Sequence, residues 1–304
     1  MKKILVIGAY GQVGTELVLA LRKKYGDSQV IASGIHKEAS VVLDAMDKEA
    51  ILFIVKKENV GEIYHLAALL SSSGEKDPKR CWELNMGSLR NVLDVGVEHK
   101  LKIFWPSSIA AFGPTTPKES TPQHTIIEPT TMYGVTKYAG ELLCQYYYKK
   151  FSVDVRSIRY PGLISGSDEP SGGTTDYAVA IFHGALKEGK YTCYLSENTY
   201  LPMMYMDDAI RATISLMEAP AEKLKTRMSY NLSAISFSPK EIAAEIKKHV
   251  PDFKISYAPD HRQAIADSWP SSIDDSEARR DWGWQHEYDL PKMTEVVLKN
   301  LKKN

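Results

Sequence analysis

Three glycines within the first fifteen residues constrain the fold of this chain more than any other feature. They occupy positions 8, 11 and 14 of IGAYGQVGTEL, after the apolar run Lys3 to Ile7 and at the start of a helical pattern from Gln12 to Tyr25. A strand, a glycine turn and a helix in this order let a pyrophosphate approach the free N–H groups of the helix. The pattern predicts a dinucleotide-binding βαβ unit, with cofactor contacts from Gly8, Gly11, Gln12, Val13 and Gly14.

The next 135 or so residues alternate apolar strands with amphipathic helices. Strands are predicted at 29–33, 63–67, 102–107 and 153–159, and helices at 48–57, 78–99 and 132–151. This alternation predicts an α/β fold with a doubly wound parallel sheet covered on both faces. We expect a Rossmann domain over 1–160, and a smaller substrate-binding lobe over 161–304 with a helix near 175–188. The segment near 204–232 is expected to return to the first domain.

The composition restricts the kind of partner that the chain is expected to bind and the cellular compartment that is expected for it. The 38 Lys and Arg residues balance 38 Asp and Glu, which indicates neither a nucleic-acid nor a membrane partner. No segment approaches about 18 consecutive apolar residues. The three cysteines, Cys81, Cys144 and Cys193, are widely spaced and fit a reducing compartment. We predict a cytoplasmic protein with a small-molecule substrate and, since the histidines lack ligand spacing, no metal.

The second predicted strand lacks the acid that usually selects NAD. An Asp or Glu about 20 residues after the glycine loop commonly bonds the adenosine 2′-hydroxyl. In VIASGIHK, Gly34 stands at that place, and His36 and Lys37 could accept a 2′-phosphate. These residues alone leave NAD and NADP open. Further predicted cofactor contacts are Asp44, Ala45, Leu66, Ala67, Ala68 and Tyr160, although Asp44 could equally be a loop or helix-cap aspartate.

Tyr133 lies four residues before Lys137 in TTMYGVTKYAGELL. The same spacing occurs at Tyr146 and at Tyr288, about as often as chance predicts, so the spacing alone identifies nothing. The position of Tyr133 in the fold is what distinguishes it. Its helix follows the strand KIFWPSS, which ends in Ser108 at the edge of the sheet where ligands bind. Residues four apart share a helix face, so the ammonium of Lys137 can approach the phenol.

The chemistry of these three residues suits the removal of a proton from an alcohol. A phenol needs roughly 4 kcal/mol of stabilisation to bring its pKa from about 10 to about 7. One cation about 4 Å away supplies that at an effective dielectric constant of about 20. We predict that Tyr133 is a general base tuned by Lys137, and that Ser108 orients the substrate hydroxyl.

At this point the chain resembles the extended, sugar-epimerase-like short-chain dehydrogenases/reductases. Within that group it is most similar to the short-chain L-threonine 3-dehydrogenases, through SSIAAFGPTTPKE, TMYGVTK, RSIRYPGLIS, GGTTDYAV, PMMYMDDAI and IADSWPSSIDDS. The resemblance spans essentially the whole chain. It implies NAD as cofactor, L-threonine as substrate and a homodimer, with Lys137 also bonding the nicotinamide ribose. Gly34 departs from the aspartate that is usual in the family.

Substrate contacts are predicted from Ser71, Ser108, Tyr133, Gly173, Thr175 and Trp269. SGGTTDYAVAIF places glycines and threonines at a helix amino terminus, which suits a carboxylate, although Thr175 or Asp176 could instead cap the helix. Ser71 and Trp269 follow from the resemblance; a loop serine and a core aromatic are the alternatives. Two other functions stay open: a nucleotide-sugar epimerase or dehydratase, which Arg262 would favour, and a non-catalytic NAD(P)-binding regulator.

Overall fold

The computed structural model describes residues 2–166 and 173–302. Its largest sheet contains six parallel strands in the order β3-β2-β1-β4-β5-β7. These are β1 (Lys3–Ile7), β2 (Val30–Gly34), β3 (Val41–Val42), β4 (Val60–His65), β5 (Lys102–Phe104) and β7 (Asp154–Arg156). The strand order reverses between β1 and β4, so the carboxyl ends of these two strands open a crevice. The prediction of a doubly wound α/β fold is confirmed.

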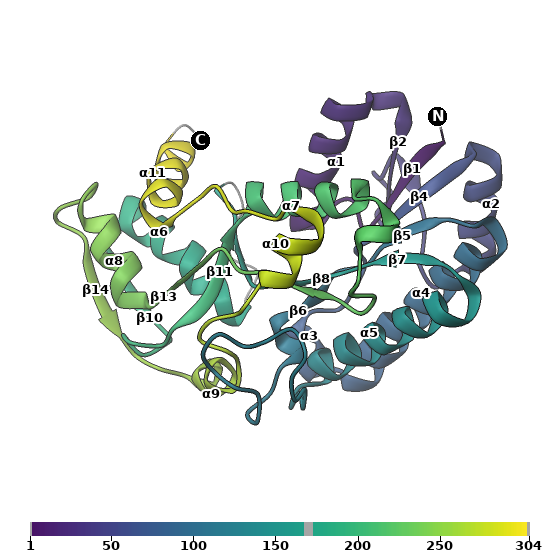
Figure 1. Ribbon diagram of the computed structural model, residues 1–304. Helices are drawn as coiled ribbons and strands as arrows, with labels where there is room; N and C mark the ends of the chain where they lie inside the picture. The colour runs from purple at the N-terminus through teal and green to yellow at the C-terminus, as the bar shows by residue number, and fades with distance from the viewer. Residues whose placement is uncertain (1, 167–172, 303–304) are drawn as a thin grey trace.

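Helices cover both faces of this sheet (Figure 1). Ile4 and Val6 of β1 pack with α1 (Gln12–Tyr25) and α7 (Met206–Glu218) on one face. The alternate residues, Leu5 and Ile7, pack with three helices on the other face. Those helices are α2 (Lys48–Glu58), α4 (Pro78–His99) and α5 (Met132–Phe151). Because both faces of β1 are covered, Ile4 to Ile7 are all apolar and buried.

The other lobe, at the left of Figure 1, combines two small sheets with four helices. One sheet has the order β13-β11-β9 and the other pairs β10 with β14. Its strands are β9 (Gly162–Ile164), β10 (Lys190–Cys193), β11 (Leu201–Tyr205), β13 (Ile235–Phe237) and β14 (Lys254–Tyr257). Its helices are α6 (Tyr177–Lys187), α8 (Pro239–Lys247), α9 (His261–Ser268) and α11 (Leu290–Leu301). Their apolar side chains form one shared core.

A third small sheet, β12-β8-β6, lies at the junction of the two lobes. It contains β6 (Ser107–Ser108), β8 (Ile158–Tyr160) and β12 (Tyr230–Asn231). The two strands predicted at 102–107 and 153–159 are therefore each divided, and only their first parts belong to the main sheet. Pro106, which has no N–H to donate, follows β5 and separates it from β6. The structure thus corrects the predicted strands and places Ser108 in the smaller sheet.

The chain returns to the first lobe after crossing into the second. Met204, Met206 and Leu232 lie in the same buried cluster as Ile4 of β1. The cluster also includes Trp284, which follows α10 (Ser276–Trp282), so a second return occurs there. The division of the chain into 1–160 and 161–304 stays a prediction.

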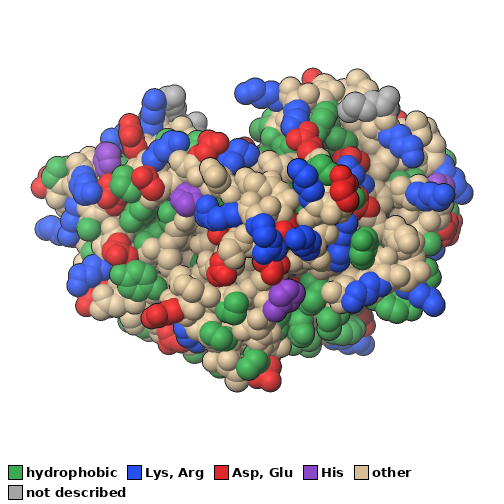
Figure 2. Space-filling model, in the orientation of Figure 1, with side chains coloured by type: hydrophobic (Ala, Val, Ile, Leu, Met, Phe, Trp, Pro, Cys, Tyr) green, Lys and Arg blue, Asp and Glu red, His purple; other side chains and the backbone are tan. Residues whose placement is uncertain are grey.

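The surface offers no block of one charge on the face that Figure 2 shows, where basic and acidic side chains alternate. Among the described residues, no helix is long and apolar enough to cross a membrane. Within the same residues, no three His, Cys, Asp or Glu side chains gather as they would around a metal ion. The predicted absence of a metal stays a prediction.

Candidate active site

The glycine loop follows β1, and two of its glycines are required by packing. Gly8 has a φ of +85°, and a Cβ atom there would lie 2.8 Å from the backbone nitrogen of Ala67. A Cβ atom on Gly14 would lie 2.2 Å from the carbonyl oxygen of Gly8. Gly11 differs, because its Cβ would meet only Gly8 O at 3.6 Å. The room above Gly11, at the amino terminus of α1, is where a pyrophosphate would approach the helix.

The segment after β4 forms the opposite wall of this crevice. Ala67 packs on Gly8, and the backbone of Leu69 is held by Asn85 of α4. The Asn85 side chain accepts a hydrogen bond from Leu69 N (2.8 Å), donates to Leu69 O (3.0 Å) and also donates to Thr136 Oγ1 (3.1 Å). One buried amide thus ties the cofactor wall to the helix that carries Tyr133. Sequence reasoning missed Asn85, since nothing local marks a helical asparagine as buried.

The start of α5 brings Tyr133 to Ser108. Thr131 caps this helix by accepting a hydrogen bond from Gly134 N (3.1 Å). A Cβ atom on Gly134 would lie 2.1 Å from Ala110 O, so the first turn of α5 packs directly on the 3₁₀ turn that follows Ser108. Ser108 and Tyr133 line the same cavity, and the Ser108 hydroxyl is close enough to lower the pKa of the phenol. The structure therefore brings together two of the three residues predicted to carry the reaction.

Lys137 completes the group from one turn further along α5. Its ammonium donates a hydrogen bond to Pro106 O (2.6 Å) and lies 5.4 Å from the centre of the Tyr133 ring. It also faces the ring of Trp105 at 4.6 Å. The lysine is thus held across the break between β5 and β6, beside the phenol but not bonded to it.

The electrostatics of the site differ from the prediction. Burial raises the pKa of Tyr133 to about 12, and the hydrogen bond with Ser108 offsets only part of that effect. Burial also lowers the pKa of Lys137 to about 8, while Cys144, Cys81 and Glu141 act in the opposite direction. The prediction that Lys137 brings the pKa of the phenol to about 7 is therefore wrong, because desolvation by burial is the largest effect on Tyr133.

A buried ion pair supports the catalytic group from behind. Glu141, one turn after Lys137, accepts two hydrogen bonds from the Arg159 guanidinium, at 2.9 and 2.7 Å. Its first carboxylate oxygen also accepts a bond from Ser107 Oγ (2.6 Å), next to Ser108. Glu141 is fully buried and Arg159 is 1% exposed. Arg159 further bonds Gln123 O and Asn231 Oδ1, so β6, β8 and β12 meet at this pair.

A cavity of about 400 Å³ opens beside these residues and reaches both lobes. Predicted site residues that line it are Gln12, Val13, Leu66, Ala68, Ser71, Ser108, Tyr133, Lys137, Tyr160, Gly173, Thr175 and Trp269. The cavity is also lined by residues that sequence reasoning missed, including Leu69, Pro106, Ala110, Gly162, Leu163 and Thr174. Each of these lies within a few residues of a predicted one, so the motifs could have indicated them.

Six predicted cofactor residues do not line this cavity. Gly8, Gly14 and Ala67 belong to the close backbone packing described above, and Gly11 is the N-cap of α1. The Asp44 carboxylate accepts a hydrogen bond from Met46 N (2.9 Å) in its own turn. Ala45 is buried, and its carbonyl accepts a bond from Asn91. Asp44 thus has a structural role in its turn, and its predicted contact with the cofactor stays a prediction.

The turn before α6 presents Thr175 to the cavity. Asp176 stabilises this turn, because its carboxylate accepts a hydrogen bond from Gly173 N (2.9 Å). Tyr194 donates to Gly173 O (3.0 Å), which fixes the turn from the other side. Asp176 therefore has the capping role that was the alternative prediction for these residues. Thr175 packs against Gly162 at the wall of the cavity. The residues just before Gly173, which belong to the same predicted glycine-rich turn, lie outside the described residues.

Trp269 closes the cavity from the carboxyl end of α9. It is 7% exposed, and Lys118 donates to its carbonyl oxygen (3.2 Å) and to that of Asp267 (2.9 Å). Ser271 N in turn donates to Lys118 O (2.8 Å). Lys118 belongs to the proline-rich loop 113–131, so that loop holds the wall of the cavity in place.

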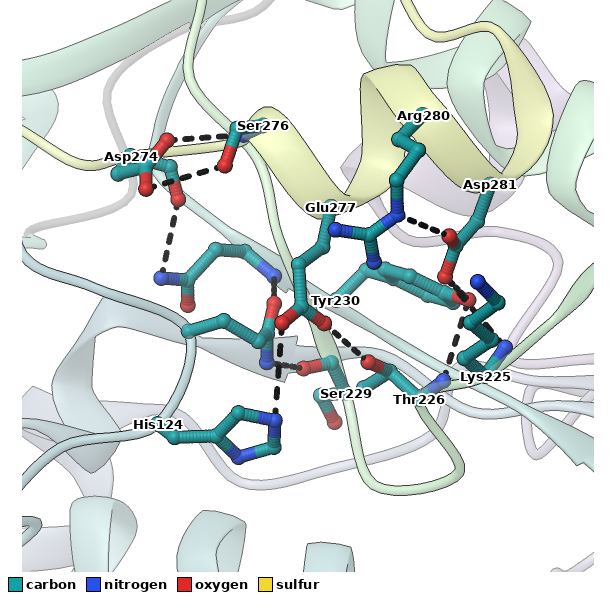
Figure 3. A network of polar contacts seen from close by, with 12 residues as sticks. His124, Lys225, Thr226, Ser229, Tyr230, Asp274, Ser276, Glu277, Arg280 and Asp281 are labelled. Carbon is teal, nitrogen blue, oxygen red and sulfur yellow. Dashed lines mark hydrogen bonds and ion pairs between the residues drawn. The ribbon is translucent and has the colours of Figure 1, made fainter.

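The middle of the same loop lies beside the polar network in Figure 3. Nε2 of His124 lies 3.6 Å from the Glu277 carboxylate of α10, which also accepts a bond from Thr226 (2.6 Å). Tyr230 donates to Asp281 (2.8 Å) in the next turn of α10. These contacts join the two segments that return to the first lobe, and the loop lies beside them at His124.

A dinucleotide-binding crevice that leads to a Ser, Tyr and Lys group defines a class of oxidoreductase. In agreement, residues 4–233 match the model of the NAD dependent epimerase/dehydratase family. The chain belongs to this family. Membership makes NAD its cofactor, as the resemblance implied, and the coarse prediction of an NAD-dependent oxidoreductase is confirmed.

Three relatives are similar over nearly their whole length. An uncharacterized epimerase/dehydratase of Staphylococcus haemolyticus is 53% identical, over 99% of this chain and 98% of its own. The holo structure of a GalE-like L-threonine dehydrogenase from Cupriavidus necator is 54% identical, with a TM-score of 0.96 over 98% and 99% of the two chains. A monomeric L-threonine 3-dehydrogenase from a metagenome is 51% identical, with a TM-score of 0.95 over 99% of each chain. The predicted resemblance to L-threonine 3-dehydrogenases is confirmed as a similarity.

Proposed function

We propose that this chain oxidises L-threonine at Cβ with NAD+, giving 2-amino-3-ketobutyrate. The observation that carries the proposal is the single cavity in which Ser108 and Tyr133 face the small polar groups Ser71 and Thr175. The similarity to threonine dehydrogenases over the full chain supports the choice of substrate.

In this reaction the residues of the chain handle the proton and the orientation of the substrate. Bound NAD+ supplies the hydride acceptor. Ser108 bonds the β-hydroxyl, and Tyr133 takes its proton as the C–H bond breaks, so one hydride and one proton leave together. Lys137, held on Pro106 O, provides positive charge beside the forming phenolate. The backbone of the Gly173 to Thr175 turn faces the substrate carboxylate, and Trp269 excludes water.

A second candidate, epimerisation or dehydration of a nucleotide sugar, is favoured by the family description and the name of the staphylococcal relative. Arg262 was the residue that could have held a diphosphate. Its guanidinium instead bonds both carboxylate oxygens of Asp260 and lies over the Tyr194 ring. Because Arg262 is already paired with Asp260, it is a poor partner for a diphosphate, and this favours threonine oxidation. A non-catalytic NAD(P)-binding role would leave the Ser108, Tyr133 and Lys137 arrangement without a use.

The deciding experiment mixes purified protein with NAD+ and, separately, L-threonine, L-serine and UDP-sugars, and follows NADH absorbance. We expect strong turnover with L-threonine alone. Epimerisation of a UDP-sugar without net NADH would establish the second candidate instead. The Tyr133→Phe protein serves as the control for a contaminating dehydrogenase.

We also propose a cytoplasmic homodimer. The three cysteines are free and buried, which suits a reducing compartment. Val135, Leu142 and Tyr146 expose apolar surface along one stretch of α5, at 36%, 46% and 53%. Since one relative is described as monomeric, the state must be measured. Light scattering should give twice the chain mass for wild type and a monomer for Leu142→Glu; a monomeric wild type would refute the proposal.

A further inference from the structure

The end of β2 holds a tyrosine above the glycine that replaces the expected acid. A Cβ atom on Gly34 would lie 2.8 Å from Cδ2 of the Tyr10 ring. The Tyr10 hydroxyl accepts a hydrogen bond from Ser40 N (2.6 Å) and lies 3.2 Å from Ser40 Oγ. The glycine loop is thus bonded to the turn between β2 and β3. The ring fills the space from which a side chain at position 34 would project.

This end of the crevice presents hydroxyl groups and cations. Tyr10 is 44% exposed, and the side chains of His36 and Lys37 follow on the exposed turn. Hydrogen bonds from Ser40 lower the pKa of the Tyr10 phenol, and the charge of Arg22 acts in the same direction. Two acids lie in the same stretch of chain: Glu38 is exposed on the turn, and Asp44 accepts the Met46 N–H in its own loop.

We propose that Tyr10 and Ser40 form the adenosine-ribose end of the cofactor site and that this site binds NADP as well as NAD, with Lys37 as the partner of the 2′-phosphate. A carboxylate at the end of β2 would bond a 2′-hydroxyl and repel a 2′-phosphate. The two hydroxyls bond the ribose without repelling a phosphate. The inference rests on the dinucleotide cofactor and not on threonine, so the two proposals can fail separately.

The packing of Tyr10 makes a specific prediction about restoring the acid. In Gly34→Asp, the new side chain must displace the Tyr10 ring and break its bonds to Ser40, so the single substitution should weaken binding of both cofactors. In the double variant Gly34→Asp with Tyr10→Ala, the carboxylate has room. A hydrogen bond to a charged group corresponds to about 10- to 150-fold in affinity, so the double variant should bind NAD in preference to NADP by that additional factor.

The test is isothermal titration calorimetry with NAD+ and NADP+, without substrate, on wild type, the single variants Gly34→Asp and Tyr10→Ala, and the double variant. We expect wild type to bind NADP+ with a Kd within about 10-fold of that for NAD+. A wild-type Kd for NADP+ more than about 1,000-fold above that for NAD+ would overturn the proposal. Equal discrimination by Gly34→Asp with and without Tyr10 would overturn the role of the tyrosine.

A matched pair of charge variants tests the phosphate partner. Lys37→Ala should weaken NADP+ by about 5-fold or more at low salt and leave NAD+ unchanged, because only the phosphate loses a cation. Lys23→Ala removes an exposed cation from α1 and should change neither. If both variants weaken NADP+ equally, Lys37 has no specific role. Thermal shifts with each cofactor give a second readout that does not depend on catalysis.

Discussion

The two sides of the cavity are built in different ways. On the Tyr133 side, Lys137, Glu141 and Arg159 are at most 4% exposed; Lys137 bonds Pro106 O (2.6 Å), and Arg159 bonds Glu141 (2.9 and 2.7 Å). On the opposite side, Trp269 is positioned through the backbone by one partly exposed lysine, Lys118. The first side is held by buried charged groups, and the second by backbone contacts of one lysine, so we expect the second to adjust more readily to a ligand. Changes on the first should therefore affect stability and turnover, and changes on the second should affect substrate affinity.

The largest effect is expected from Glu141→Gln. It leaves the Arg159 guanidinium buried without a counter-charge, and breaking such a pair typically costs about 3 to 5 kcal/mol. Urea denaturation monitored by circular dichroism would measure the loss. Glu245→Gln is the control, because its partner Lys248 is exposed and the change should stay within about 1 kcal/mol. Similar losses in both variants would remove the distinction between the two sides.

Tyr133→Phe should lower kcat by at least about 100-fold, or roughly 2.7 kcal/mol, because the proton acceptor is lost. Fold and NAD+ affinity should be unchanged, as the ring and its packing stay. In wild type, kcat/KM should rise with pH up to about 8, since more of the phenol is ionised, until Lys137 loses its charge. A Phe variant with near-wild-type kcat would show that another group accepts the proton.

The buried side should also be sensitive to acid through His65. Burial lowers the pKa of His65 to about 3, with Lys137 as a smaller cause, from an unfolded value of about 6.5. Between these values the unfolded chain binds one more proton, so stability falls as pH falls, by about 2 kcal/mol from pH 7 to pH 5. Urea titrations at both pH values should show a smaller difference in His65→Asn. His249→Gln, at an exposed site, should keep the wild-type difference.

The smallest effect is expected on the adjustable side. Lys118→Met removes two hydrogen bonds to the carboxyl end of α9. Loss of about 1 kcal/mol of positioning corresponds to a rise of about 5-fold in KM for L-threonine, with kcat within about 2-fold. Lys240→Met, on the exposed face of α8, is the matched control. A fall in kcat with an unchanged KM would show that this side is as fixed as the other.

Regular elements with clear end signals could be predicted from the sequence alone. The helices at 12–25, 78–99 and 132–151 were predicted with the bounds that the structure shows. Capping explains two of these starts, since Asp77 and Thr131 accept bonds from the first turns of their helices. Pro106 marks the break in the strand predicted at 102–107, but the sequence does not show which sheet the second part joins, because Ser108 pairs with Tyr160, far along the chain.

The residues of the site fall into the same two groups, those that the sequence could indicate and those that it could not. Residues next to a motif, such as Ser108, Tyr133 and Thr175, could be proposed because the fold places strand ends at one edge. Tyr10 above Gly34, Glu141 with Arg159 and Lys118 below Trp269 could not be proposed. Their roles depend on burial and on partners 18 to 151 residues away, which neither periodicity nor spacing reports.

The contacts of the loop 113–131 also determine when the site can form during synthesis. Gln123 exchanges hydrogen bonds with Ser229 and Asn231, and Thr121 pairs with Ile273. Chain segments separated by more than 100 residues must meet before this loop is fixed, and such distant closures are slow. A nascent chain that ends near residue 160 contains the glycine loop and the Tyr133 helix, but it lacks α7, which covers one face of the main sheet. The loop gains these contacts only after residue 273 has left the ribosome, so we expect both lobes and the cavity between them to form late in synthesis.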